Sequence, residues 1–303
     1  MSDSNHEIVS IIVVGRDKFS PTDGCLESLE KNTPEPHETI LVLGGAPPAV
    51  RRRLTEKFGQ KVKMIFNEEF LNPAQSRNIG LKACKTRLAV LMDNDVFVRP
   101  GWLPPLLECQ KDTGSVMVVP IILETPRRIH TAGNRFYITQ EGGKSYGHKE
   151  LCFWSMIYGD SCNLTRGPTE YGELHCQLLE VEPTLRLKAF DENLQEVGEC
   201  DSALTWSRAG LKMYFEPESV VFYALNYPVA AEDIRFFEWR WDMNNILKGY
   251  VHFEKKWGID ITEHGEFRNF LLAYNKKVGI LPRLFPSAAA IKADQFLKRR
   301  KHE

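Results

Sequence analysis

Short apolar segments alternate with amphipathic segments over about the first 95 residues, and this alternation constrains the fold more than any other feature. The apolar segments are rich in β-branched residues and have the length of buried strands, and they lie at 8–14, 39–43, 63–66 and 88–92. The segments between them have helical spacing, and they lie at 25–33, 49–58 and 73–83. Strands that alternate with helices predict an α/β fold, Rossmann-like, with a mostly parallel central sheet flanked by helices.

The rest of the chain continues the pattern less regularly. Glycines break residues 124–172 into short hairpin-like pieces. Further strands are expected at 116–119, 176–181, 211–215 and 219–223, and helices at 102–111, 202–209 and 231–256. This order predicts two halves of one domain, residues 1–115 and 116–228, followed by a C-terminal helical extension at residues 229–303.

Charge and cysteine content narrow the class of protein. The net charge is 39 minus 40, or −1, which argues against a nucleic-acid partner held by phosphate neutralisation. The seven cysteines show no C-x-x-C pairing, as expected of reduced thiols in a cytoplasmic protein. We see no signal-peptide core at the N-terminus and no apolar run near the ~20 residues of a membrane span. The basic residues 298–301 predict either a solvated end or a weak peripheral contact with the inner face of a membrane.

Two carboxylates follow the apolar strand at 88–92. Asp93 and Asp95, separated by Asn94, lie where ligands of α/β sheets bind, beyond the carboxyl end of a strand. Two hard oxygen donors this close suit Mg²⁺ or Mn²⁺ shared with a substrate phosphate. The alternative interpretation is an ordinary polar turn, because Asp and Asn favour turns.

A second acidic pair, Glu199 and Asp201, precedes the helix expected at 202–209. These acids could serve only as a helix cap or an N-terminal charge. The functional interpretation is a general base across a cleft from the metal, with one acid facing the cleft and the other supporting it. Arg77 and Asn78, in the helix at 73–83, are candidates to contact a diphosphate, although an exposed helical Arg is the commoner case.

Several motifs in sequence order resemble the donor half of family 2 glycosyltransferases with the GT-A fold. The resemblance covers about residues 7–225, and the order of the motifs is much more specific than any one of them. The motifs are Asn72–Leu81, Leu91–Asp95, Pro100–Leu103, Ile129–Gly133, Phe190–Glu192, and Gly198–Asp201 followed by Arg208–Gly210.

The resemblance implies an inverting, hexosyltransferase-type transfer from a nucleotide-diphosphate sugar, expected to be a UDP-sugar, with Mn²⁺ or Mg²⁺ as cofactor. Residues 1–115 would bind the donor, and residues 116–228 would bind the acceptor, a saccharide or lipid-linked saccharide, and catalyse transfer. By resemblance Asp93 and Asp95 form the Asp-x-Asp motif for metal and diphosphate, with Asp95 as the direct metal ligand and Asn94 beside the donor. Glu199 falls at the position of the base and Asp201 at a second acid.

The sequence departs from the family pattern at three places. An acidic turn that contacts the nucleobase is replaced by Leu43–Pro48, so Arg16 and Asp17 are expected to contact the donor instead. Tyr223 stands where the family often has a metal-binding His, which predicts weak metal binding or a site completed by water. His175 replaces a small residue and is predicted, with Trp102, to contact the acceptor; a packed histidine is its alternative.

Two other functions remain open from the sequence. A sugar nucleotidyltransferase of related architecture would carry a glycine-rich basic loop after the first strand, and Gly15–Lys18 is a poor version of it. A non-catalytic sugar- or nucleotide-binding relative is favoured by the missing acidic turn and by Tyr223, and is opposed by the retained acids. Resemblance in fold does not decide between these functions.

Overall fold

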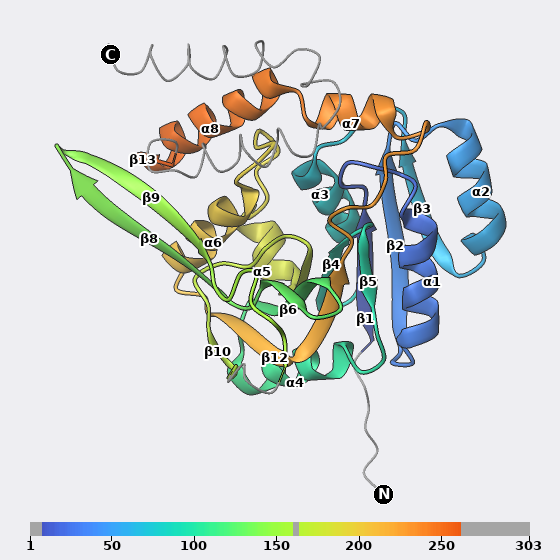
Figure 1. The fold of residues 1–303 in the computed structure, drawn as a ribbon, viewed down its shortest axis with the longest axis horizontal. Helices are drawn as coiled ribbons and strands as arrows, with labels where there is room; N and C mark the ends of the chain where they lie inside the picture. The colour runs from blue at the N-terminus through green and yellow to red at the C-terminus, as the bar shows by residue number, and fades with distance from the viewer. Residues whose placement is uncertain (1–7, 160–163, 262–303) are drawn as a thin grey trace, which may run out of the picture.

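A central sheet runs through the part of the chain that the computed structural model describes, residues 8–159 and 164–261 (Figure 1). Its strands are β1 (Val9–Val14), β2 (His37–Gly44), β3 (Val62–Asn67), β4 (Leu88–Asp93), β5 (Val96–Val98), β6 (Met117–Thr125), β7 (Arg128–Thr131), β10 (Gly167–Pro168), β11 (Cys176–Glu180) and β12 (Met213–Tyr223). Their order is β10-β12-β6-β11-β4-β1-β2-β3, with β5 paired to β12 and β7 paired to β6.

The predicted α/β fold is confirmed, and the sheet is mixed. Strands β3, β2, β1 and β4 are parallel, as the alternation with helices requires. Strand β11 is antiparallel to both β4 and β6, while β12 is parallel to β6. A strand that is buried on both faces is apolar throughout whatever its direction, so the sequence did not reveal the reversal at β11.

Helices cover both faces of this sheet. One face packs against α1 (Thr22–Asn32), α2 (Pro48–Phe58) and α4 (Leu103–Thr113). The other face packs against α3 (Pro73–Ala83), α5 (Val181–Arg186) and α6 (Gly198–Arg208). Successive residues of β1 point to opposite faces, so that Ile11 and Val13 join the first core and Ile12 and Val14 join the second. Both layers hold the carboxyl ends of β1 and β4 in place.

Four predicted elements, two strands and two helices, differ from the structure. The strands expected at 211–215 and 219–223 are one strand, β12, with an irregularity between Glu216 and Val220, where Pro217 has no N–H for the ladder. Helix α6 begins at Gly198, so Glu199 and Asp201 lie in its first turn rather than before it. The helix expected at 231–256 is divided into α7 (Ile234–Arg240) and α8 (Met243–Trp257) by Asp242, whose side chain accepts from the Asn245 N–H at 3.0 Å and caps α8.

The described part of the C-terminal extension packs on α6. Side chains from α6, α7 and α8 share one apolar cluster, which includes Cys200, Phe237, Ile246 and Phe253. After α8, β13 (Ile259–Asp260) pairs with the hairpin of β8 (Asn134–Glu141) and β9 (Lys144–Leu151), which projects from the main sheet (Figure 1). The extension therefore fixes the helix that carries the predicted base.

Three further predictions concern the basic chain end, membrane-spanning helices and disulfide bonds. The basic residues 298–301 lie outside the described residues. Within residues 8–159 and 164–261, no helix has both the length and the apolar character needed to cross a membrane. The six cysteines of the described residues are all free thiols, in agreement with the expected absence of disulfides there.

Candidate functional site

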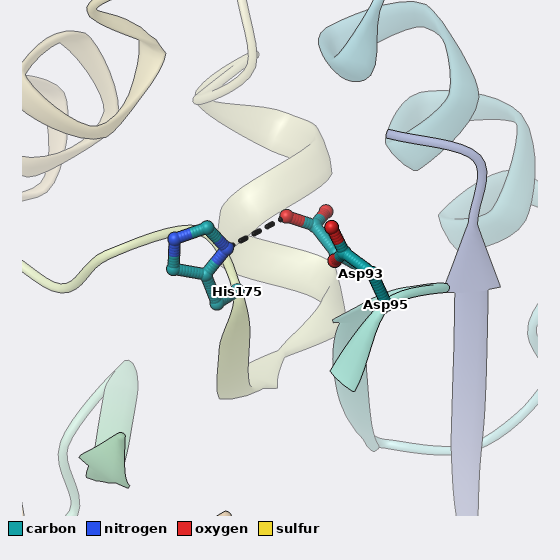
Figure 2. Close-up of side chains that lie close together, drawn as sticks. All are labelled: Asp93, Asp95 and His175. Atoms are coloured by element: carbon teal, nitrogen blue, oxygen red, sulfur yellow. Dashed lines mark hydrogen bonds and ion pairs between the residues drawn. The ribbon is translucent and has the colours of Figure 1, made fainter. Parts of the chain in front are cut away.

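The pairing of two strands brings a histidine to the acidic motif. Asp93 is the last residue of β4, and the antiparallel register places Met92 opposite Cys176, so His175 reaches Asp93. The His175 Nδ1 lies 3.0 Å from Asp93 Oδ2 (Figure 2). The Asp93 N–H donates to the His175 carbonyl at 3.0 Å. Side-chain ligand atoms of Asp93, Asp95 and His175 all lie within 4.8 Å of one another.

The three side chains form a donor set that fits a divalent cation. Burial, with added repulsion from Asp93, raises the pKa of Asp95 to about 7 despite the nearby Arg16. Burial and the Arg16 charge lower the pKa of His175 to about 3, so its imidazole is neutral and able to act as a ligand. Asp95 Oδ1 is buried and accepts no hydrogen bond from the described residues. Two carboxylates and an imidazole suit Mn²⁺, and a bound cation would favour the ionised form of Asp95.

Two arginines approach the same carboxylates. Arg16 Nε lies 3.6 Å from Asp93 Oδ2, its Nη1 lies 3.6 Å from Asp95 Oδ2, and the same Nη1 donates to the Tyr223 hydroxyl. Arg77 Nη2 donates to Asp93 Oδ1 at 2.6 Å. Burial by itself raises the pKa of Asp93, but the charge of Arg77 and the hydrogen bond with His175 hold that pKa below its usual value. Asp93 is therefore ionised and already shared between cations.

Two buried guanidinium groups have donors with no acceptor among the described residues. Arg77 is 1% exposed and Arg240 is 4% exposed. In the described part of the chain, Nε and Nη1 of both side chains have no hydrogen-bond acceptor. Arg240 Nη2 is paired with Glu196 Oε1 at 2.6 Å. Because an unsatisfied buried donor costs about 1–3 kcal/mol, such groups indicate an anionic ligand.

These groups meet at one cavity with about 700 Å³ of empty space, solvent at its mouth included. Its lining contains predicted site residues from both halves of the domain. They are Arg16, Arg77, Asp93, His175 and Glu199. Additional charged side chains in the lining are Lys149, Glu173, Asp191, Glu196 and Arg240. The charged and polar lining suits a small, charged, hydroxyl-bearing ligand.

The two acids of α6 point to different surroundings. Glu199 lines the cavity and forms an ion pair with Lys149, whose Nζ also lies 3.4 Å from Glu173 Oε1. Burial by itself raises the pKa of Glu199, but the Lys149 charge and hydrogen bond outweigh it and lower the pKa. Asp201 Oδ1 faces α8, where it accepts from Trp257 Nε1 and pairs with Lys256 Nζ, both at 2.7 Å. Glu199 is thus placed to act on a ligand, and Asp201 ties α6 to the C-terminal extension.

Three residues that were predicted to contact the sugar-nucleotide donor form hydrogen bonds within the protein. Asp17 accepts from Trp241 Nε1 at 3.2 Å. Asn94 Nδ2 donates to Lys18 O and Thr22 Oγ1, each at 2.7 Å. Asn78 Nδ2 donates to Phe190 O at 3.0 Å. These side chains fix the loops around the cavity and do not belong to its lining.

Trp102, predicted to contact the acceptor, has a buried side chain. Trp102 is 1% exposed, packs in the core beneath α4, and donates from Nε1 to Thr33 Oγ1 at 3.0 Å. Its bulk is required by the core, since its large apolar ring gains most when fully removed from water. The ring is therefore inaccessible to an acceptor.

Sequence reasoning missed four charged residues of the cavity, Lys149, Glu173, Glu196 and Arg240, and named Asp191 only as part of a motif. Lys149 comes from β9, in the glycine-broken region, and Glu173 from the segment before β11. Arg240 comes from the end of α7, which was treated only as an extension. The sequence feature that could have indicated Arg240 is its position between Trp239 and Trp241, because aromatic rings often pack against a guanidinium group.

Comparisons with known proteins agree with this architecture. The model of the family described as glycosyl transferase family 2 matches residues 10–177. An uncharacterized glycosyltransferase of Haemophilus influenzae is 22% identical over 165 residues, which are 53% of this chain and 51% of that protein. "Probable N-acetylgalactosaminyltransferase 7" of Caenorhabditis elegans is 24% identical over 160 residues, which are 50% of this chain and 26% of that protein.

A solved structure gives the same picture of the fold. The crystal structure of GalNAc-T7 with UDP, GalNAc and Mn²⁺ matches with a TM-score of 0.59, covering 90% of this chain and 55% of that chain at 17% identity. At that identity the likeness shows the fold alone. The chain spans about half or less of the length of the curated relatives that it matches.

Proposed function

This chain belongs to glycosyl transferase family 2, and we propose that it transfers a sugar from a nucleotide-diphosphate sugar to an acceptor hydroxyl with inversion at the anomeric carbon. A UDP-sugar is the donor proposed. One observation carries the proposal: Asp93 and Glu199, from opposite halves of the domain, line one cavity together with two buried guanidinium groups that have unused donors. A diphosphate needs the cationic groups, and an acceptor hydroxyl needs the carboxylate.

The diphosphate would lie against Arg77 and Arg240. Their unused Nε and Nη1 donors suit phosphate oxygens, and their burial strengthens attraction to the charge that develops on the leaving group. Asp93, Asp95 and His175 would hold Mn²⁺ or Mg²⁺, which when bound supplies further positive charge to the diphosphate. Arg16, which lies between the two carboxylates, would keep them oriented.

Glu199 is the proposed general base. Its carboxylate takes the proton of the acceptor hydroxyl as the oxygen attacks the anomeric carbon from the face opposite the diphosphate, which gives inversion in one displacement. The lowered pKa keeps Glu199 ionised, and the bond to Lys149 holds it in place. Asp201 is proposed to position the first turn of α6 through Trp257 and Lys256. A saccharide or a lipid-linked saccharide is the proposed acceptor, because the cavity offers many polar groups to hydroxyls.

A second candidate function is binding of the donor without transfer. The observation in its favour is the ion pair between Glu199 and Lys149, because a carboxylate with a lowered pKa is a weaker base. Binding and transfer make different predictions for turnover, although both require donor affinity.

The test is a panel of sugar nucleotides that differ in base and sugar, assayed with the full chain for release of nucleoside diphosphate, with and without Mn²⁺. Calorimetry measures affinity for the same compounds. Transfer predicts metal-stimulated release from a UDP-sugar, and NMR of the product should show the inverted anomer. Affinity without release, on any saccharide acceptor supplied, supports binding alone. Absence of affinity for every sugar nucleotide contradicts both functions.

A further inference from the structure

An apolar loop is exposed just after the strand that carries Lys149 of the cavity. It follows β9 and comprises residues 152–158, here named the 152–158 loop. The exposed fractions are 39% for Phe153, 61% for Trp154, 48% for Met156 and 59% for Ile157. Single exposed apolar residues are common, but four within five positions indicate a surface for interaction.

The backbone of the 152–158 loop is held in a defined conformation. Phe153 and Ser155 have φ values of 60° and 63°, which side-chain-bearing residues rarely adopt. Strand β7 supports the loop: the Ser155 N–H donates to Ile129 O at 2.8 Å, and the Ile129 N–H donates to Met156 O at 2.9 Å. The Tyr158 N–H donates to Arg127 O at 2.7 Å. The fold therefore uses backbone bonds to display these apolar side chains.

Basic side chains surround the apolar ones. Arg127, on the turn between β6 and β7, and Arg128, the first residue of β7, are both exposed next to the loop. Arg128 Nη1 lies 3.4 Å from Ser155 Oγ, and the Arg99 guanidinium lies 5.9 Å from the centre of the Tyr158 ring. Glu124 offsets part of this charge, since its carboxylate lies 3.8 Å from Arg128 Nε. Glu150, Arg135 and Glu170 act on Cys152 at the start of the loop, so four arginines stand against three glutamates. The surface combines exposed aromatic groups with a small surplus of arginine.

We propose that the 152–158 loop docks the protein on an anionic membrane surface. Trp154 and its apolar neighbours would enter the interfacial layer, where amphipathic aromatic rings are favoured, and Arg127 and Arg128 would contact lipid phosphates. Exposed arginines are complementary to the phosphates of an anionic leaflet, and an exposed Trp beside them suits the interfacial layer, so a lipid surface is the partner that we propose. A single weak signal gives only marginal binding to a membrane, and apolar insertion together with charge provides two.

The 152–158 loop is supported by a strand that also reaches the candidate functional site. Strand β7, which supports the loop, also carries His130, whose ring centre lies 5.3 Å from that of His175. Docking would bring the cavity close to the lipid headgroups and suit a lipid-linked acceptor; this consequence rests on the proposed function, whereas docking itself does not.

The experiment is co-sedimentation of the full chain with vesicles of phosphatidylcholine, alone or mixed with phosphatidylglycerol. Binding should require phosphatidylglycerol and weaken with added salt. Trp154→Ser combined with Met156→Ser should weaken binding about tenfold or more. Arg127→Gln and Arg128→Gln should each weaken it by about fivefold. The matched control is Val251→Ser, at a residue of α8 that is 46% exposed, and it should bind as wild type.

Other occupants of the surface give different results. No binding to anionic vesicles overturns the proposal. Loss of binding on replacing the basic residues 298–301, with the loop variants binding as wild type, assigns membrane contact to the chain end and also overturns it. A dimer in sedimentation velocity without lipid that Trp154→Ser dissociates shows that a second copy covers the loop. Because the assay reads binding alone, an inactive transferase would leave its result unchanged.

Discussion

Replacement of Glu199 by Gln tests the proposed chemistry most directly. The change removes the charge that accepts the proton and nearly preserves the shape of the side chain. A positioned general base contributes ~10²–10⁴-fold in rate, so turnover should fall by that factor, which corresponds to about 3–5 kcal/mol in the barrier. Affinity for the sugar nucleotide should change little, because the base acts on the acceptor hydroxyl.

Glu199→Gln should also lower the free energy of unfolding. Lys149 loses its ion pair with Glu199 but keeps Glu173, 3.4 Å away. Removing one partner of a buried pair costs about 3–5 kcal/mol when the other charge is stranded, and the remaining carboxylate should reduce this to about 1–3 kcal/mol. The melting temperature should fall by several degrees, with the fold retained at the assay temperature.

The control is Asp201→Asn in the first turn of the same helix. Asn still accepts from Trp257, and Lys256 keeps Asp191 at 3.0 Å, so turnover should fall less than in Glu199→Gln. Both variants are assayed for turnover on one confirmed donor and acceptor, beside calorimetric donor affinity and melting. A stable but inactive Asp201→Asn, with Glu199→Gln near wild type, would show that Asp201 is the base. Full turnover in both would refute the catalytic role of this acidic turn.

Four further predictions follow from the site and its surroundings. Asp95→Ala should abolish Mn²⁺-dependent donor binding with little change in melting, and unchanged calorimetric affinity with Mn²⁺ would contradict the metal role. Arg240→Ala should weaken donor affinity about 10–100-fold by losing charge-assisted hydrogen bonds, whereas equal affinity in calorimetry would remove Arg240 from the diphosphate site. Burial by itself would raise the pKa of Asp191, but hydrogen bonds from His252, the Asn193 N–H and Lys256 hold that pKa below the usual range. The stability that this carboxylate contributes is present above the ordinary Asp pKa and is lost as pH falls through the lowered pKa. Asp191→Asn should therefore make the melting temperature fall less steeply at acid pH, and an unchanged acid part of the pH–melting profile would contradict this. Thiol titration of the denatured, non-reduced protein should find all seven cysteines free, and a lower count would reveal a disulfide.

Local sequence patterns predicted much of the N-terminal half. The apolar runs and the proline at the start of helix 73–83 placed the elements well, and that helix matches α3. The position of Asp93 at a strand end also followed from the pattern, because the carboxyl end of a buried strand is a local feature of the chain. The order of the motifs along the chain indicated the family, and the family model matches residues 10–177.

Contacts between distant residues decided the rest. The sequence left His175 open between a packed and an acceptor-binding role, whereas the antiparallel pairing of β11 with β4 brings it to Asp93. Trp102 was expected to contact the acceptor but is required by the core. Glu199 and Asp201 were separated into a cavity residue and a structural residue only by α6 and α8 packing together. Local propensity and periodicity determine which elements form, but partners many tens of residues apart in the chain determine what each side chain faces, because burial and charge pairing are properties of the assembled fold.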